Sequence, residues 1–185
     1  ARRSIRVPMK SWLRWFGVMW LVMGMAAAKE APAELRKVDG IAYYPADQKV
    51  EDPEKRCFVD LRLPENAQNF PTLVWFHGGG LTGGKREFPK FEGRGLALVA
   101  AGYRLSPQAK CPEFIEDAAA AVAWTVKHIA EYGGDPKKVF VGGHSAGGYL
   151  TLMTGMDPKW LAAHGLTNRP LAGLIPVSAQ VTTHF

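Results

Sequence analysis

The sequence predicts one α/β domain with a mostly parallel sheet and helices on both of its faces. Short apolar runs end in glycine or proline, a long alanine-rich helical pattern lies between two of them, and strand and helix patterns alternate along the chain. Parallel strands need crossover connections, usually helices, so this alternation favours a parallel sheet. The chain has 185 residues, 47% of them hydrophobic, which is enough for one core.

The first 28 residues have the pattern of a secretory signal peptide. Five basic residues precede an apolar run, residues 15–25, and small residues end at Ala28. We expect cleavage after Ala28 and a secreted or periplasmic protein. The run is short for a transmembrane helix, so a retained anchor is the weaker alternative and no stable membrane anchor is expected. Met9 would open a more conventional leader, so the segment Ala1 to Pro8 is open to being an upstream start artefact.

Composition argues against several kinds of partner. The formal charge is +6, but without the five basic leader residues 18 basic side chains stand against 17 acidic ones. No basic stripe remains to neutralise phosphates, so nucleic acid is not an expected partner. No cluster of His, Cys and carboxylate residues has ligand spacing, so no metal or cofactor is predicted. Cys57 and Cys111 could form a disulfide after export or stay unpaired, and the sequence leaves both open.

The first half of the domain reads as an arm followed by strands. Residues 29–53 are polar and interrupted by prolines, which predicts an extended arm with a short strand at 41–44. The stretch CFVDLRLP, residues 57–64, alternates as a half-buried strand does. TLVWFHGGG, residues 72–80, is an unbroken apolar run that ends in three glycines. Such a run suits a strand covered on both faces.

The second half continues the alternation. LALVAAGYRL, residues 96–105, predicts another buried strand, and residues 112–132 carry apolar side chains at helical spacing with acids in the first turn. Gly133 and Gly134 are expected to end that helix, and Asp135-Pro136 to turn the chain. VFVGG is then a strand, a helix follows Ser145, and LAGLIPV is a further strand.

One serine is surrounded by glycines at a strand-to-helix junction. Gly143-His144-Ser145-Ala146-Gly147 matches G-x-S-x-G with a strand before it and a helix after it. The residues two before and two after such a serine approach each other closely, so a β-carbon there would clash. The following helix directs free N–H groups toward the serine. The alternative is a glycine-rich turn in which the serine has no catalytic role.

A second glycine motif makes that alternative weaker. His77-Gly78-Gly79-Gly80 ends an earlier strand, and consecutive glycines let backbone N–H groups face inward. Acyl transfer needs such donors where the carbonyl oxygen gains negative charge. A phosphate-cradling P-loop is not indicated, because no G-K-[ST] follows.

With HGGG, YRLSP, the D-x-x-x-A-x-x-W helix at 117–124 and YGGDPKKVFVGGHSAGGYL, the sequence resembles α/β-hydrolase fold esterases of the hormone-sensitive-lipase-like or carbohydrate-esterase kind. The likeness covers about residues 59–177. It implies that Ser145 is the nucleophile and that the N–H groups of Gly79, Gly80 and Ala146 form the oxyanion hole. It also implies a structural role for Tyr103 and Arg104.

The resemblance implies an acid and then a histidine later in the chain than Ser145. Asp157, His164 and His184 are the candidates after Ser145, and none has the position expected of the family. We therefore expect residues 29–185 to be the N-terminal part of the domain, with acid and base beyond Phe185. A short-range triad of Ser145, Asp157 and His164 is the minor alternative. His77 is expected to brace the glycine loop, and His128 to lie on the surface or pack.

These patterns predict an exported serine carboxylesterase for short acyl esters, on small molecules or polysaccharides, that works through an acyl-enzyme. A serine peptidase on the same fold is a close variant. A non-catalytic binding protein with this fold, or an inactive fragment, is the rival from another class. The retained serine and glycine loop favour the enzyme.

Overall fold

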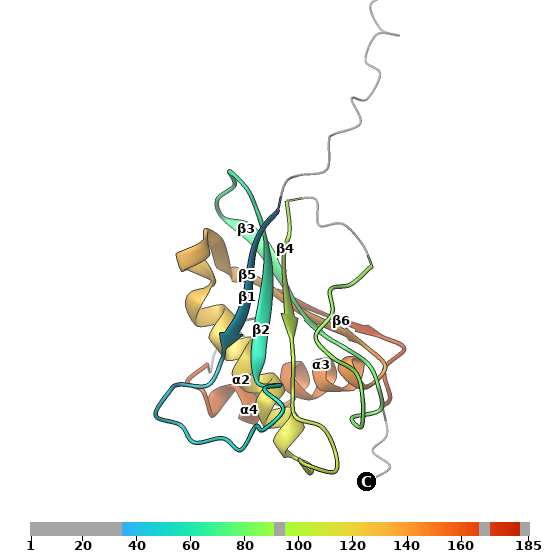
Figure 1. Cartoon of the computed structure of the whole chain (residues 1–185). Helices are drawn as coiled ribbons and strands as arrows, with labels where there is room; N and C mark the ends of the chain where they lie inside the picture. Colours follow the sequence, from blue (N-terminus) through green and yellow to red (C-terminus); the bar gives the residue numbers. More distant parts are fainter. Residues whose placement is uncertain (1–34, 91–94, 167–170, 182–185) are drawn as a thin grey trace, which may run out of the picture. The chain divides into compact units, whose positions relative to one another are not determined.

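The computed structural model describes residues 35–90, 95–166 and 171–181 (Figure 1). Within them, six strands form one sheet in the order β1-β2-β4-β3-β5-β6. The strands are β1 (Leu35–Ala42), β2 (Phe58–Pro64), β3 (Phe70–Phe76), β4 (Ala97–Ala101), β5 (Gly134–His144) and β6 (Gly173–Val177). The helices are α2 (Glu113–His128), η1 (Ile129–Tyr132), α3 (Ala146–Met156) and α4 (Pro158–Ala162). The predicted signal peptide, residues 1–28, lies outside the described residues.

The strand order brings two strand ends together. Strands β4, β3, β5 and β6 pair in parallel, whereas β1 and β2 join the sheet antiparallel to their neighbours. From β3 the chain moves outward to β4, and from β5 it moves the opposite way to β6. Connections that diverge leave a crevice at the carboxyl ends of adjacent parallel strands, where ligands bind in such sheets. His77 directly follows β3 and Ser145 directly follows β5, so both lie at the carboxyl ends of these two adjacent strands.

Alternate residues of the strands divide the core between the two faces of the sheet. Val59, Val74 and Val141 belong to the larger cluster, which includes residues of α2, α3 and α4. These three helices also contact one another, so they share one face (Figure 1). On the opposite face Leu73, Trp75 and Leu98 form a smaller cluster with Phe88, Leu96 and Phe140. The helices expected on this second face are not among the described residues.

Helix α2 confirms the strongest helical prediction. Ile115, Ala119 and Val122, three of the apolar positions at helical spacing, are buried, and Glu113 and Glu116 lie in the first turn. The last predicted turn is the 3-10 helix η1, which Gly133 ends with φ +98°. A left-handed residue at this place is what a glycine supplies without steric cost.

The N-terminal arm and the start of β5 differ from their predictions. Strand β1 extends over Leu35–Ala42 rather than 41–44, because its antiparallel pairing with β2 decides its length. A register shift between Val38 and Ile41 interrupts the alternation of side chains along β1. The sequence therefore lacks the alternating pattern that would predict the whole strand. Strand β5 begins at Gly134, so Asp135-Pro136 lies within the strand instead of forming a separate turn.

Two further features concern the cysteines and the helices. Both cysteines are free thiols, Cys57 buried and Cys111 exposed, so the disulfide alternative is not realised in this structure. Burial is the largest cause that raises the pKa of the Cys57 thiol, which keeps it protonated. Across residues 35–90, 95–166 and 171–181, every helix is too short or too polar to span a bilayer.

Candidate active site

Ser145 occupies a strained turn between β5 and α3. Its backbone has φ +54° and ψ −115°, a region that residues with a side chain rarely adopt. The Ser145 N–H donates to the carbonyl of Val177 on β6 at 2.9 Å, and the Ser145 carbonyl accepts from the Tyr149 N–H at 3.0 Å. The surrounding hydrogen bonds therefore hold Ser145 in a backbone conformation that is unfavourable for a serine in isolation.

The glycines on either side of Ser145 are required by space. A β-carbon on Gly143 would lie 2.4 Å from the carbonyl carbon of Gly147. A β-carbon on Gly147 would lie 2.1 Å from the carbonyl oxygen of Phe76, at the end of β3. Separations this short are not available to real β-carbons. The close approach expected around the serine is thus present in the structure.

The two glycine motifs meet beside Ser145. A β-carbon on Gly78 would lie 3.5 Å from the Ser145 β-carbon and 3.2 Å from Nδ1 of His144. Gly78 is the first glycine after β3, so the loop that begins there runs alongside the serine turn. The parallel register of β3 and β5, which pairs Phe76 with Gly143, brings the two ends to the same level.

The loop from His77 to Gly84 (the glycine loop) forms a compact turn. Gly79 and Gly80 have φ +117° and +62°, and the Gly79 carbonyl accepts from the N–H groups of Gly83 at 3.0 Å and Thr82 at 3.1 Å. Among the described residues, the Gly79 and Gly80 N–H groups donate to no backbone acceptor. Ala146 opens α3, where first-turn N–H groups have no partner within the helix. The expected oxyanion donors thus belong to the glycine loop and to the first turn of α3, which meet at Ser145.

His77 lies beneath the glycine loop and is 2% exposed. Its Nδ1 is 2.6 Å from the Gly78 carbonyl, which can only accept, so Nδ1 carries a proton there. The Tyr103 ring stacks on the imidazole at 4.4 Å, and the Tyr103 hydroxyl donates to the His77 carbonyl at 2.8 Å. Burial lowers the pKa of His77, and the hydrogen bond to Gly78 opposes that shift. The expected bracing role of His77 is confirmed.

A buried ion pair fixes the chain just after β4. The Arg104 guanidinium donates to both oxygens of Asp117, with Nη2 at 2.8 Å and Nε at 2.9 Å, and the Arg104 N–H donates to the same carboxylate at 2.9 Å. The Tyr44 hydroxyl donates to Asp117 at 2.7 Å. Asp117 is fully buried, and its hydrogen bonds raise the pKa of Arg104. These contacts of Arg104, together with those of Tyr103 to His77, confirm the structural role expected of Tyr103 and Arg104.

The remaining candidate triad residues lie away from Ser145. Helix α3 has 11 residues, so Asp157 at its far end stands about 18 Å from Ser145 at its start. Asp157 caps α4 and pairs with Lys159 at 3.0 Å. His164 follows α4 just before Gly165. The triad of Ser145, Asp157 and His164 is therefore wrong.

The other histidines supply no base to Ser145 among the described residues. His144 is exposed and packs beside Gly78, and no hydrogen bond joins it to the Ser145 hydroxyl. His128 bonds Glu131 at 2.8 Å and stacks on Trp124. His184 lies outside the described residues. Within the described ranges, no group of three or more His, Cys, Asp or Glu side chains is arranged to hold a metal ion.

Strand order, serine turn and glycine loop together define an α/β-hydrolase fold. The family model described as BD-FAE matches residues 59–165, which is more than half of the chain. The chain therefore belongs to the BD-FAE family. The match includes both the glycine loop and the serine turn.

Known relatives and solved structures agree with this class. Carboxylesterase NlhH of Mycobacterium tuberculosis is 36% identical over 94 residues, which are 48% of this chain and 30% of NlhH. The inhibited esterase B of Lactobacillus rhamnosis has a TM-score of 0.63 at 20% identity, over 91% of this chain and 58% of that one. A bacterial heroin esterase has a TM-score of 0.52 at 26% identity, over 84% of this chain and 47% of its own. The chain thus spans about a third of NlhH.

Proposed function

We propose that the protein hydrolyses carboxylic esters with Ser145 as the nucleophile. The observation that carries the proposal is the strained Ser145 turn packed directly against the glycine loop. A binding surface gains nothing from a serine at positive φ, whereas a nucleophile gains exposure at the end of the sheet. The identity to carboxylesterase NlhH supports the same chemistry.

The arrangement suggests a two-step acyl transfer. The Ser145 hydroxyl attacks the ester carbonyl, and the N–H groups of Gly79, Gly80 and Ala146 stabilise the oxyanion of the tetrahedral intermediate. The intermediate collapses, the alcohol leaves with a proton, and the acyl group stays on Ser145. Water then attacks the acyl-enzyme and releases the acid. The proposal assigns the general base and its acidic partner to parts of the protein outside the described residues.

The substrate class is the finer part of the proposal. Short acyl chains on polysaccharides suit a protein whose first residues resemble a secretory signal. The two glycine motifs resemble those of esterases, which favours an ester as the bond that is cleaved. Peptide bonds are the competing substrate on this fold. Acetylated polysaccharide, p-nitrophenyl acetate and a peptide p-nitroanilide therefore make the discriminating panel.

The test compares the complete gene product with its Ser145→Ala variant on that panel. The matched control is Ser106→Ala, because it keeps the Ser106 N–H that donates to the Leu81 carbonyl and removes only a hydroxyl that makes no hydrogen bond among the described residues. We expect ester cleavage in the wild type and in Ser106→Ala, and a loss of kcat of roughly 10⁴-fold or more in Ser145→Ala. Ester cleavage that survives in Ser145→Ala would contradict the proposal. Cleavage of the anilide alone would favour a peptidase.

A further inference from the structure

Three segments hold the glycine loop by its carbonyl oxygens. The His77 carbonyl accepts from the Tyr103 hydroxyl at 2.8 Å, and the Leu81 carbonyl accepts from the Ser106 N–H at 2.8 Å. The Gly84 carbonyl accepts from Nη1 of Arg56 at 3.0 Å. The loop is thus held at its start, middle and end through acceptors, which leaves N–H groups for another partner.

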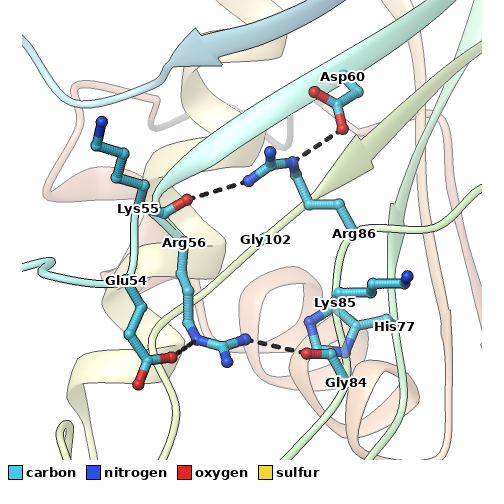
Figure 2. Close-up of a pocket in the computed structure, with 9 residues that line it drawn as sticks. All are labelled: Glu54, Lys55, Arg56, Asp60, His77, Gly84, Lys85, Arg86 and Gly102. Carbon is cyan, nitrogen blue, oxygen red and sulfur yellow. Dashed lines mark hydrogen bonds and ion pairs between the residues drawn. The ribbon is translucent and has the colours of Figure 1, made fainter.

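The contact at the end of the loop comes from a reciprocal clamp (Figure 2). Arg56 reaches from the segment before β2 to the Gly84 carbonyl, while Nη1 of Arg86 reaches back to the Lys55 carbonyl at 3.3 Å. Nε of Arg86 also pairs with Asp60 on β2 at 2.9 Å. These side chains border a cleft of about 310 Å³ beside His77. Each arginine therefore fixes the segment that carries the other.

The base of Arg56 is itself held in place. The Asp52 carboxylate accepts from the N–H groups of Arg56 at 2.8 Å and Cys57 at 2.7 Å. Gly102 packs against the Arg56 backbone so closely that a β-carbon there would lie 2.1 Å from the Arg56 carbonyl oxygen. The Arg56 side chain is 26% exposed. The guanidinium therefore starts from a fixed backbone and reaches a defined carbonyl.

We propose that Arg56 is a positioning residue for the oxyanion donors of the glycine loop. The inference rests on the proposed function. The route is short: Arg56 holds Gly84, the adjacent Gly83 N–H bonds the Gly79 carbonyl, and Gly79 and Gly80 carry the donors. Arg56 lies outside residues 59–165, which match the family, so the family match does not assign it a role. The Arg56 guanidinium also pairs with Glu54. The contact with Gly84 and the ion pair with Glu54 can therefore be removed one at a time by substitution.

The experiment uses the complete gene product with Arg56→Met and the matched control Glu54→Gln. The first variant removes the contact to Gly84, and the second removes only the ion pair at the other side of the fork. We measure kcat and KM for p-nitrophenyl acetate, and amide hydrogen exchange of the peptide covering residues 77–84. Near-ultraviolet circular dichroism establishes that each variant is folded.

We expect Arg56→Met to lower kcat by about 10- to 100-fold with KM within about twofold, because displaced donors weaken only the transition state. Exchange in residues 77–84 should rise in Arg56→Met and stay at the wild-type level in Glu54→Gln. If Arg56→Met fails to fold, Arg56→Lys, which keeps a donor without the fork, takes its place with the same expected direction.

The outcomes separate this inference from the proposed function. Unchanged kcat and unchanged exchange in Arg56→Met, with an active wild type, would overturn the positioning role and leave the esterase proposal intact. An inactive wild type would count against the esterase proposal, and increased exchange in Arg56→Met would then still support the clamp. A fall in kcat without any change in exchange would also overturn the clamp.

Discussion

Gly147 packs against Phe76 so tightly that a β-carbon on Gly147 would lie 2.1 Å from the Phe76 carbonyl oxygen. This contact joins the first turn of α3 to the last residue of β3. It therefore couples the turn that carries Ser145 to the strand that carries the glycine loop. The geometry of the candidate site depends on this approach as much as on the serine itself.

Replacement of Gly147 by alanine should separate the two elements. The new methyl group would meet backbone atoms that cannot rotate away, so we expect Gly147→Ala to lower the free energy of unfolding by about 3 kcal/mol. Gly83→Ala is the control, because its β-carbon would find its nearest neighbour at 3.9 Å. Urea unfolding followed by tryptophan fluorescence measures both. Equal stability of the two variants would contradict the close contact.

The ion pair of Asp117 with Arg104 should stabilise the fold far more than the ion pair of Glu113 with Arg104. Asp117→Asn leaves a mostly buried guanidinium without its carboxylate, and we expect a loss of about 3–5 kcal/mol. Glu113→Gln removes the other acid that contacts Arg104. The Glu113 side chain is 40% exposed, so this change should cost less than about 1 kcal/mol. Chemical denaturation of both variants tests this contrast. A similar loss in the two would show that burial does not decide the strength of the pair.

Acid should weaken the fold through His77. Burial lowers the pKa of His77 in the folded protein below its ordinary value of 6.5, so the unfolded chain takes up this proton at higher pH. The stabilisation is complete above that ordinary value and is lost as the pH falls from there through the folded value. We expect the free energy of unfolding to fall more steeply below pH 6.5 in the wild type than in His77→Asn.

The comparison with His77→Asn isolates this one group. The asparagine amide can replace Nδ1–H as the donor to the Gly78 carbonyl but does not titrate. His164, whose pKa burial also lowers, is present in both proteins and cancels in the difference. Urea unfolding at several values between about pH 5 and 7.5 gives the two slopes. Parallel slopes would show that His77 does not carry the pH dependence.

Local patterns were enough to predict the elements that surround the candidate site. The apolar run before His77 and the helical spacing after Pro112 both reflect burial within one element, so a single sequence displays them. The glycines around Ser145 identify a sharp turn because only their missing β-carbons permit the approach. The serine turn is therefore predictable from the sequence without knowledge of the contacts between strands.

The contacts that link distant segments left no such pattern. Arg56 and Gly84 are 28 positions apart, and an arginine in an irregular loop reads as solvated. The sequence predicts only the end of strand β1, because its residues are largely exposed and its length follows from pairing with β2. The neighbour that receives a hydrogen bond is decided by the sheet order, which local periodicity does not encode.

Covalent trapping of Ser145 is the decisive test of its role as the nucleophile. The complete gene product is incubated with a p-nitrophenyl alkylphosphonate, which an activated serine attacks with loss of p-nitrophenolate, and is then analysed by intact mass and peptide mapping. We predict one adduct on Ser145 and none in Ser145→Ala. An adduct on another residue, or a fully active protein that carries no modification at Ser145, would contradict it.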